Sequence, residues 1–286
     1  PDPMWQYATP TGNALIDATN DAALARTFDL WYEGYGKYGV KAMWMDESEP
    51  DHDAYISGGQ WRLAKGIDAE ILPGWVFDWS RGFADAAASR AGLAPGESFL
   101  LSRNAWLGTA HHGAALWSGD ISSTWDSLRR QVAASLSYAL SGHAYWCEDI
   151  GGFFRPNGQH DDPEYRALLI RWFQFGAFTP IFRVHGTNGD TELWEFGDET
   201  MGAINASAIR LRYRLLPYIY SGFPRVATAG YTFVKTTKLL DKPASRSNEW
   251  SCAQSIERRK LSCCCSAPSD ALASGGGECP LSGIAS

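Results

Sequence analysis

Two aspartates that follow short apolar runs are the residues of this sequence with the clearest potential for chemistry. Asp46 follows the nearly continuous apolar run at 40–45, and Asp120 ends the segment 114–120. Taken alone, an acid after a strand caps a helix or faces water. Two such acids at two strand ends favour catalysis, because a pair of carboxyl groups can act as nucleophile or base and as general acid.

The elements that would hold these acids alternate between buried strands and amphipathic helices. Strands are predicted at 13–20, 40–46, 98–103, 114–120, 145–149 and 180–184. Helices are predicted at 21–38, 76–92, 123–142, 163–177 and 198–220, the last with a bend near Pro217. About six strand units predict a parallel sheet and an α/β fold of the (β/α)8 TIM-barrel type, where catalytic groups lie at the carboxyl ends of the strands. The barrel is incomplete, because eight units would close it and about two are missing from the front.

Two patterns that resemble known motifs are given structural interpretations instead. Residues 34–39 match G-x-G-x-x-G, but they close a helix and precede a strand, so we interpret them as a helix C-cap rather than a dinucleotide site. His111 and His112 are adjacent and point in different directions, which favours exposed loop residues over a metal site. No metal and no cofactor is predicted.

Composition limits the classes of partner. The chain has 286 residues and a net charge of −7 without a basic stripe, which argues against nucleic acid. No apolar run is long enough to span a membrane. The opening residues Pro1 to Trp5 lack the pattern of a signal peptide and predict a truncated N-terminus. The 13 Trp residues suit either a large core or a sugar-binding pocket. Compartment and oligomeric state are left open.

Five short motifs resemble glycoside hydrolase family 31 in order and spacing. They are Trp44-Met-Asp46 with Glu49-Pro50, Ser102-Arg103, Trp117-Ser-Gly-Asp120, Trp146 with Asp149-Ile-Gly-Gly-Phe153, and Phe182-Arg-Val-His-Gly186. The resemblance covers about residues 13–230. It implies a retaining α-glucosidase or α-xylosidase on a (β/α)8 barrel, with an oligosaccharide or α-glycoside as substrate.

The resemblance also implies a role for each matching residue. Asp46 is similar to the family's nucleophile and Asp120 to its general acid/base. The residues similar to groups that bind the sugar or wall its pocket are Trp44, Arg103, Trp117, Asp149, Phe153 and His185. The two catalytic carboxyl groups of a retaining glycosidase lie about 5 to 5.5 Å apart. Ends of barrel strands separated by one strand can bring such distant residues together.

The sequence departs from the family's pattern in two places. Glu47 stands where many relatives carry an uncharged residue. Beyond about residue 230 the resemblance ends, so we expect a partial catalytic domain at 1–230. Residues 231–286 form an irregular tail with a Cys triplet, expected to be disordered or to come from a reading-frame slip or fusion.

Two other functions remain open. A non-catalytic sugar-binding remnant would keep the aromatic pocket but lack the strands needed to organise catalysis. A metal-dependent hydrolase that uses His111, His112 and the acids is the third alternative.

Overall fold

The computed structural model describes residues 5–8, 14–48, 62–67, 71–235, 251–257 and 260–266. The motif residues Glu49 and Pro50 lie outside these ranges. The chain forms two compact units, Pro1–Trp117 and Ser118–Ser286. Asp46 belongs to the first unit and Asp120 to the second.

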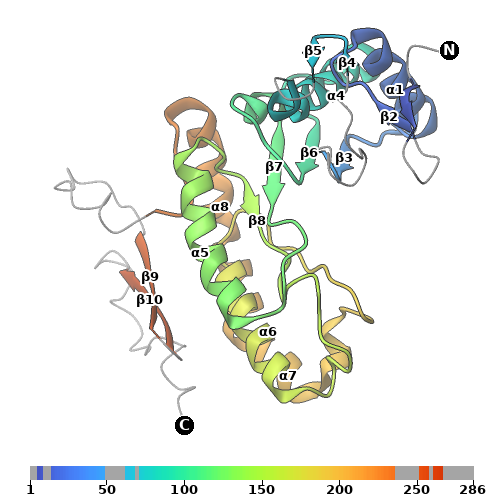
Figure 1. Cartoon of the computed structure of the whole chain (residues 1–286). Helices are drawn as coiled ribbons and strands as arrows, with labels where there is room; N and C mark the ends of the chain where they lie inside the picture. Colours follow the sequence, from blue (N-terminus) through green and yellow to red (C-terminus); the bar gives the residue numbers. More distant parts are fainter. Residues whose placement is uncertain are drawn as a thin grey trace. The chain divides into compact units, whose positions relative to one another are not determined.

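The first unit alternates parallel strands with helices (Figure 1). Its central strands are β3 (Ala42–Met45), β6 (Phe99–Ser102) and β7 (Ala114–Trp117), and β6 pairs in parallel with both neighbours. Its long helices are α1 (Asp21–Gly34) and α4 (Trp75–Ala91). The short elements are β1 (Trp5–Ala8), β2 (Ala14–Ile16), β4 (Arg62–Leu63), β5 (Gly66–Ile67), η1 (Gly36–Tyr38), η2 (Leu72–Gly74) and η3 (Thr109–His112).

The helices of this unit begin and end where the sequence offers capping groups. The Asn20 side chain accepts hydrogen bonds from the backbone N–H groups of Ala22 and Ala23, which caps α1. Gly92 ends α4 with a φ of 66°. Gly39 ends η1 with a φ of 92°, so the predicted C-cap within residues 34–39 is confirmed.

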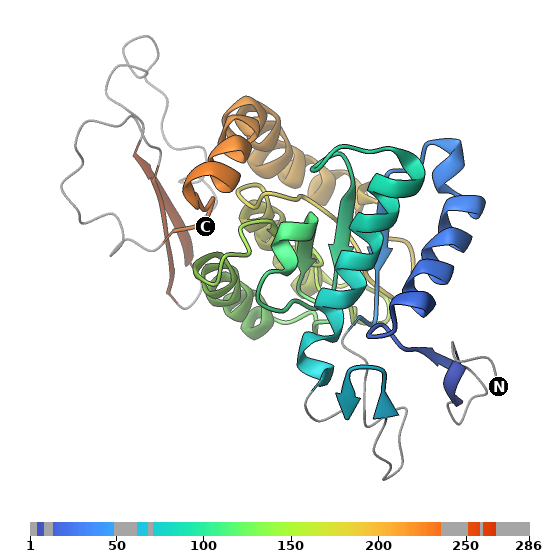
Figure 2. The same ribbon diagram turned by 90° about the horizontal axis from the view of Figure 1, so that it is seen from above.

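The core of the first unit lies between its strands and two helices. α1 and α4 lie side by side (Figure 2), and their contact includes the rings of Trp31 and Phe83, whose centroids are 5.0 Å apart. Leu100 of β6 is fully buried beneath them. Burying one face of each helix in this way stabilises the strands whose ends carry the polar residues.

The second unit contains most of the remaining helices (Figure 1). Its elements are α5 (Trp125–Leu140), β8 (Trp146–Cys147), α6 (Pro163–Gly176), η4 (Leu193–Phe196), α7 (Gly197–Ile204), the π-helical turn η5 (Asn205–Ile209), α8 (Arg210–Ala229), β9 (Ser251–Glu257) and β10 (Lys260–Ser266). Thr124 caps α5 by accepting from the Ser127 N–H, and Asp162 caps α6, which has Pro163 at its first position. Trp172 and Phe173 of α6 lie in the core of the unit.

Two predictions for this unit differ from the structure. The strand expected at 180–184 is reduced to one parallel bridge between Ile150 and Val184. The helix expected at 198–220 is instead α7, a π-helical turn and α8, and α8 continues through Pro217 and Pro224. A proline inside a helix costs a hydrogen bond, but the surrounding turns of α8 keep the helix continuous.

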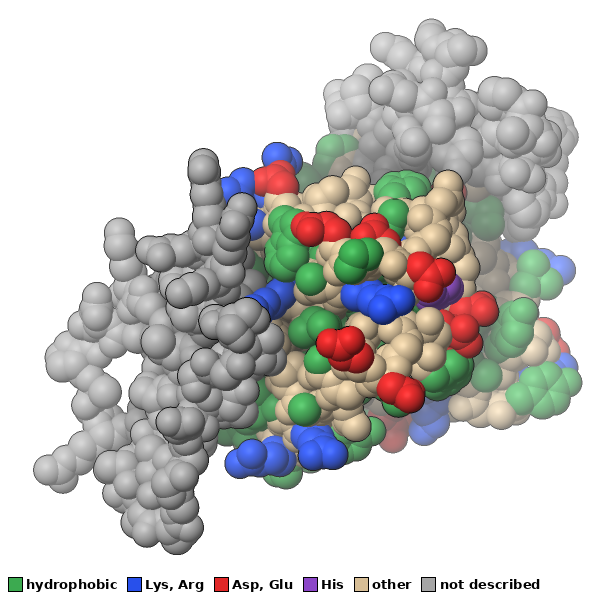
Figure 3. Space-filling model, turned by 90° about the horizontal axis from the view of Figure 1, so that it is seen from below, with side chains coloured by type: hydrophobic (Ala, Val, Ile, Leu, Met, Phe, Trp, Pro, Cys, Tyr) green, Lys and Arg blue, Asp and Glu red, His purple; other side chains and the backbone are tan. Residues whose placement is uncertain are grey.

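The C-terminal segment contains one antiparallel pair, β9 with β10, at positions where the sequence showed no periodicity. The domain boundary near residue 230 and the nature of the rest of the segment stay predictions. None of the described helices has the length and apolar character needed to cross a membrane. On the face drawn in Figure 3, acidic and basic side chains are interspersed rather than gathered into a basic patch.

Candidate active site

In the first unit, Asp46 lies beside Arg103 at the ends of two adjacent strands. β3 and β6 are parallel, with Met45 opposite Ser102, so the next residue of each strand emerges at the same edge. The Arg103 N–H donates to the Met45 carbonyl at 3.3 Å, and an Arg103 guanidinium nitrogen lies 3.2 Å from an Asp46 carboxylate oxygen. The Asp46 side chain is 48% exposed. A carboxylate that is paired with a cation yet open to solvent can reach a bound molecule.

The backbone turns sharply directly after Asp46. Glu47 has a φ of 48°, in the left-handed region that a glutamate rarely adopts. Its N–H donates to the Asp46 carboxylate at 2.8 Å. The hydroxyl groups of Ser48 and Ser102 then meet at 3.0 Å, both buried. The turn therefore fixes the direction in which the Asp46 carboxylate leaves the strand.

Two tryptophans of the same unit form an aromatic surface. The rings of Trp44 and Trp117 meet edge to face with centroids 5.8 Å apart. Trp117 is buried, whereas Trp44 is 49% exposed. A half-exposed indole two residues before Asp46 offers an apolar face to the ring of a sugar.

In the second unit, Asp120 lies on a short segment that residues 149–154 hold by hydrogen bonds. The N–H of Asp149 donates to the Ser118 hydroxyl at 3.1 Å. The N–H groups of Phe153 and Phe154 donate to the Ile121 carbonyl at 2.7 and 3.1 Å. Asp120, which is exposed, therefore lies between two anchored neighbours.

The backbone conformation and close packing at this contact explain why the motif contains two glycines. Gly151 and Gly152 have φ values of 94° and 82°. A Cβ atom on Gly152 would lie 2.5 Å from the Ser123 hydroxyl oxygen and 2.6 Å from its Cα. A Cβ on Gly151 would lie 2.7 Å from the Tyr165 hydroxyl oxygen. Only glycine combines this backbone conformation with so close an approach.

Asp149 is a fully buried carboxylate that pairs with Arg183. The Arg183 guanidinium donates to Oδ1, and no other described residue donates to Oδ2. Burial raises the pKa of Asp149 to about 7; the Arg183 charge opposes that rise, and the nearby Asp120 adds to it. The three side chains therefore form one electrostatic cluster within the second unit.

Phe153 and His185 lie together, with ring centroids 5.3 Å apart, and both are partly exposed. The buried Arg155 guanidinium links their two segments. It donates to the carbonyls of Ile150 at 2.9 Å and of His185 at 3.2 Å. The predicted pocket residues of the second unit are thus brought together around one buried cation.

The surroundings of His111 and His112 favour a structural role for this histidine pair. His112 packs edge to face on Phe77 at 4.9 Å between ring centroids, and burial lowers the pKa of His112. Within the described ranges, no group of three or more His, Cys, Asp or Glu residues has the geometry of a metal site.

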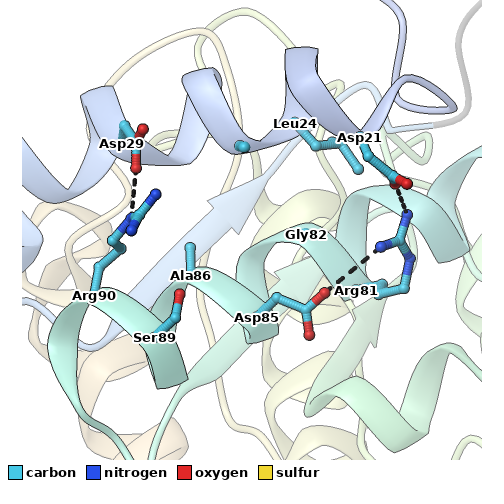
Figure 4. A pocket seen from close by; sticks show the side chains of 10 residues that line it. Asp21, Leu24, Asp29, Arg81, Gly82, Asp85, Ala86, Ser89 and Arg90 are labelled. Carbon is cyan, nitrogen blue, oxygen red and sulfur yellow. Dashed lines mark hydrogen bonds and ion pairs between the residues drawn. The ribbon is translucent and has the colours of Figure 1, made fainter.

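A pocket of about 200 Å³ lies elsewhere, between α1 and α4 (Figure 4). Its charged side chains are already paired: Arg81 with Asp21 at 2.7 Å, and Arg90 with Asp29 at 2.6 Å. None of the predicted site residues lines it.

Comparison with known proteins identifies the family. Residues 2–222 match the family model described as the glycosyl hydrolases family 31 TIM-barrel domain. The chain belongs to glycosyl hydrolase family 31. The predicted family and the partial (β/α)8 barrel are therefore confirmed, and the parallel strands with their helices agree with both.

Similar family 31 proteins include α-xylosidases and α-glucosidases. An alpha-xylosidase of Saccharolobus solfataricus is 35% identical over 211 residues, which are 73% of this chain and 28% of that protein. A probable glucan 1,3-alpha-glucosidase of Oryza sativa is 39% identical over 210 residues, 70% of this chain and 21% of that protein.

A solved structure of a family 31 alpha-xylosidase from a soil metagenome, complexed with xylose, has a TM-score of 0.73 and 28% identity. The match covers 83% of this chain and 38% of that one. The chain spans about a third or less of the length of the curated relatives first matched.

Three charged residues of the structure, Glu148, Arg155 and Arg183, were assigned no role by the sequence analysis. Arg183 was part of a quoted motif, and the Arg-x-His spacing was the only signal for it. Arg155 and Glu148 carried no signal, because their contacts join residues that are distant in sequence. Glu148 is fully buried directly after β8, next to Asp149.

Proposed function

We propose that this chain carries the catalytic carboxylates of a retaining α-glycoside hydrolase, with Asp46 as nucleophile and Asp120 as general acid/base. The proposal is supported by family membership and by the placement of each acid directly after a strand or on a segment anchored by hydrogen bonds.

The reaction would proceed in two displacements. An Asp46 oxygen attacks the anomeric carbon while the bond to the leaving oxygen breaks, and that oxygen takes the Asp120 proton. Asp120 then removes a proton from water, which attacks the anomeric carbon and releases Asp46. The sugar leaves with its original configuration, and both carboxyl groups return to their starting states.

The observation that carries the proposal is the contact between Asp46 and Arg103. A nucleophilic carboxylate must be ionised, and the guanidinium 3.2 Å away supplies a compensating positive charge. The Glu47 N–H at 2.8 Å adds a donor to the same carboxylate. Both contacts come from the strand ends themselves, so they exist before any substrate binds.

Terminal α-linked xylose or glucose is the proposed substrate, bound by Trp44, Arg103, Trp117, Asp149, Phe153 and His185. Alpha-xylosidases and glucosidases both occur among the sequence relatives and the similar structures, and xylosides are our first choice of the two. The reason is that two further segments, residues 172–180 and 192–196, resemble the α-xylosidase branch of the family.

Parallel assays of purified protein on aryl α-xyloside and aryl α-glucoside test the proposal. We expect turnover of at least one substrate and none by a folded Asp46→Ala variant. Substantial turnover by that variant would remove Asp46 from the nucleophile role. The configuration of the first product, followed by NMR, distinguishes retention from inversion.

A second candidate is a non-catalytic sugar-binding protein. The half-exposed Trp44, which could stack on a sugar ring without any catalytic step, is the observation that favours binding. A thermal melt that xylose or glucose shifts upward, in protein without turnover, would support this candidate.

A further inference from the structure

Arg183 and Asp149 lie where two extended segments of the second unit run side by side. Ile150 and Val184 form a parallel bridge, and the Ile150 N–H donates to the Arg183 carbonyl at 3.3 Å. The Arg183 side chain, 18% exposed, reaches across to the fully buried Asp149 carboxylate. A buried carboxylate without such a partner is strongly destabilising, so this contact decides where Asp149 can lie.

The same residues 149–154 also hold the segment that carries Asp120. On the N-terminal side of Asp120, the Asp149 N–H donates to the Ser118 hydroxyl at 3.1 Å. On the C-terminal side of Asp120, the Phe153 N–H donates to the Ile121 carbonyl at 2.7 Å, and the Ser123 N–H donates to the Phe154 carbonyl at 3.3 Å. A displacement of Asp149 would therefore loosen the support on both sides of the Asp120 carboxyl group.

We propose that Arg183 is a positioning residue for Asp120, acting through Asp149 and the hydrogen bonds that residues 149–154 make to residues 118–123. The inference rests on the proposed role of Asp120 as general acid/base. Arg183 itself need not touch the substrate. It holds the buried Asp149 carboxyl group, and the backbone attached to that group holds the segment that carries Asp120.

An arginine suits this task better than a lysine. Its planar guanidinium presents several N–H donors in a fixed arrangement and keeps its charge in a partly buried site. An Arg183→Lys variant would retain the positive charge but not the fixed geometry. An Arg183→Met variant would remove both and leave Asp149 without its cation.

Amide hydrogen exchange tests the proposal without any need for turnover. We expect Arg183→Met to speed the exchange of the Ser123, Asp149, Phe153 and Phe154 amides at least tenfold, and Arg183→Lys to have an intermediate effect. The matched control is Arg129→Met, because Arg129 makes an exposed ion pair with Asp126 on α5. The control should leave these amides unchanged. If Arg183→Met does not fold, the lysine variant decides the result.

Unchanged exchange at these four amides, in an Arg183 variant whose α6 amides remain protected, would overturn the proposal. Increased exchange across α5 and α6 to the same degree would also overturn it, because it would indicate general destabilisation. Only a loss of protection confined to residues 118–123 and 149–154 supports a positioning role.

Leaving-group dependence provides the second readout. A misplaced acid slows the cleavage of glycosides with poor leaving groups more than those with good ones. We expect Arg183→Met to reduce turnover of phenyl glycoside at least tenfold more than that of 4-nitrophenyl glycoside. Equal losses on both would contradict the proposal. If the wild-type chain turns over neither substrate, the proposed function fails in this chain, and the exchange experiment alone decides the role of Arg183.

Discussion

Replacing Glu148 with glutamine should change how the stability of the protein depends on pH. Glu148 is completely buried, and no other described residue donates a hydrogen bond to either carboxylate oxygen. Gly176 of α6 lies against it, since a Cβ there would be 3.1 Å from Oε1. Burial raises the pKa of Glu148 from 4.5 to about 8, with a further rise from Asp149 and a decrease from Arg212.

The size of the effect follows from that pKa. Each unit of difference between the folded and unfolded pKa values corresponds to about 1.4 kcal/mol, so the shift from 4.5 to about 8 gives an upper bound of roughly 5 kcal/mol. The folded protein holds the proton more tightly than the unfolded chain does. The stabilisation is therefore complete below the unfolded pKa of 4.5 and is lost as pH rises through about 8. Glutamine cannot ionise, so the Glu148→Gln variant should not lose this stabilisation as pH rises.

Urea unfolding at pH 5 and pH 9 measures the difference. We expect the wild type to lose at least about 2 kcal/mol more than Glu148→Gln between these two values. The control is Glu192→Gln, because Glu192 is an exposed carboxylate of the same unit and should behave as the wild type does. Other titrating groups are common to both proteins and cancel in the comparison.

A difference below about 0.5 kcal/mol would refute this reasoning. It would mean that Glu148 is already ionised at pH 5 or that it is solvated at pH 9. A Glu148→Gln variant that is less stable at both pH values by the same amount would lead to the same conclusion, because that result would reflect packing rather than proton binding.

Three further predictions concern the site and its support. Asp46→Ala should abolish turnover of aryl α-glycosides of any leaving group, and residual activity above about 1% of the wild type would contradict its role. Asp120→Ala should retain more activity on 4-nitrophenyl than on phenyl glycosides, because a good leaving group needs no proton; equal losses would argue against the acid role. Gly152→Ala should destabilise the protein by roughly 3 kcal/mol in urea, because its Cβ would collide with Ser123. Gly158→Ala, with a φ of 70° but no atom within 4 Å, should cost only about 1 kcal/mol.

Much of the fold could be predicted because the strands and helices carry strong local patterns. Two such patterns are the apolar run before Asp46 and the apolar residues that recur every fourth position in α5, which are Leu128, Val132, Leu136 and Leu140. The helix cap shows the limit of that reasoning. Residues 123–126 have the sequence form of a capping box that begins at Ser123, but Thr124 makes the cap because its backbone is extended and its hydroxyl accepts from the Ser127 N–H.

The last strand and helix could not be predicted in the same way. Residues 180–184 have the composition of a strand, yet the Arg212 side chain binds the carbonyls of Ala177, Thr179 and Pro180. The distant Arg212 side chain therefore satisfies the carbonyl of Pro180, where the predicted strand begins, and the carbonyls of two residues just before it. Local periodicity cannot anticipate a contact across more than thirty residues.

The predicted site residues were recognised by motif, and their supporting partners were not. Asp149 was expected to bind the sugar, whereas the structure shows it fully buried against Arg183. Its role in sugar binding stays a prediction. Arg155 and Glu148 lie in the interior, where composition predicts apolar residues, so only the folded arrangement shows what they contact.

The left-handed backbone at Glu47 has a consequence for directed evolution. Glycine or asparagine would occupy that conformation at lower energy, by on the order of 1 kcal/mol. A library randomised at position 47 should therefore be enriched in different residues under two selections. Screening for heat resistance alone should enrich glycine and asparagine. If screening for turnover returns glutamate instead, the Glu47 side chain contributes to the reaction. That contribution would explain why the left-handed turn is retained.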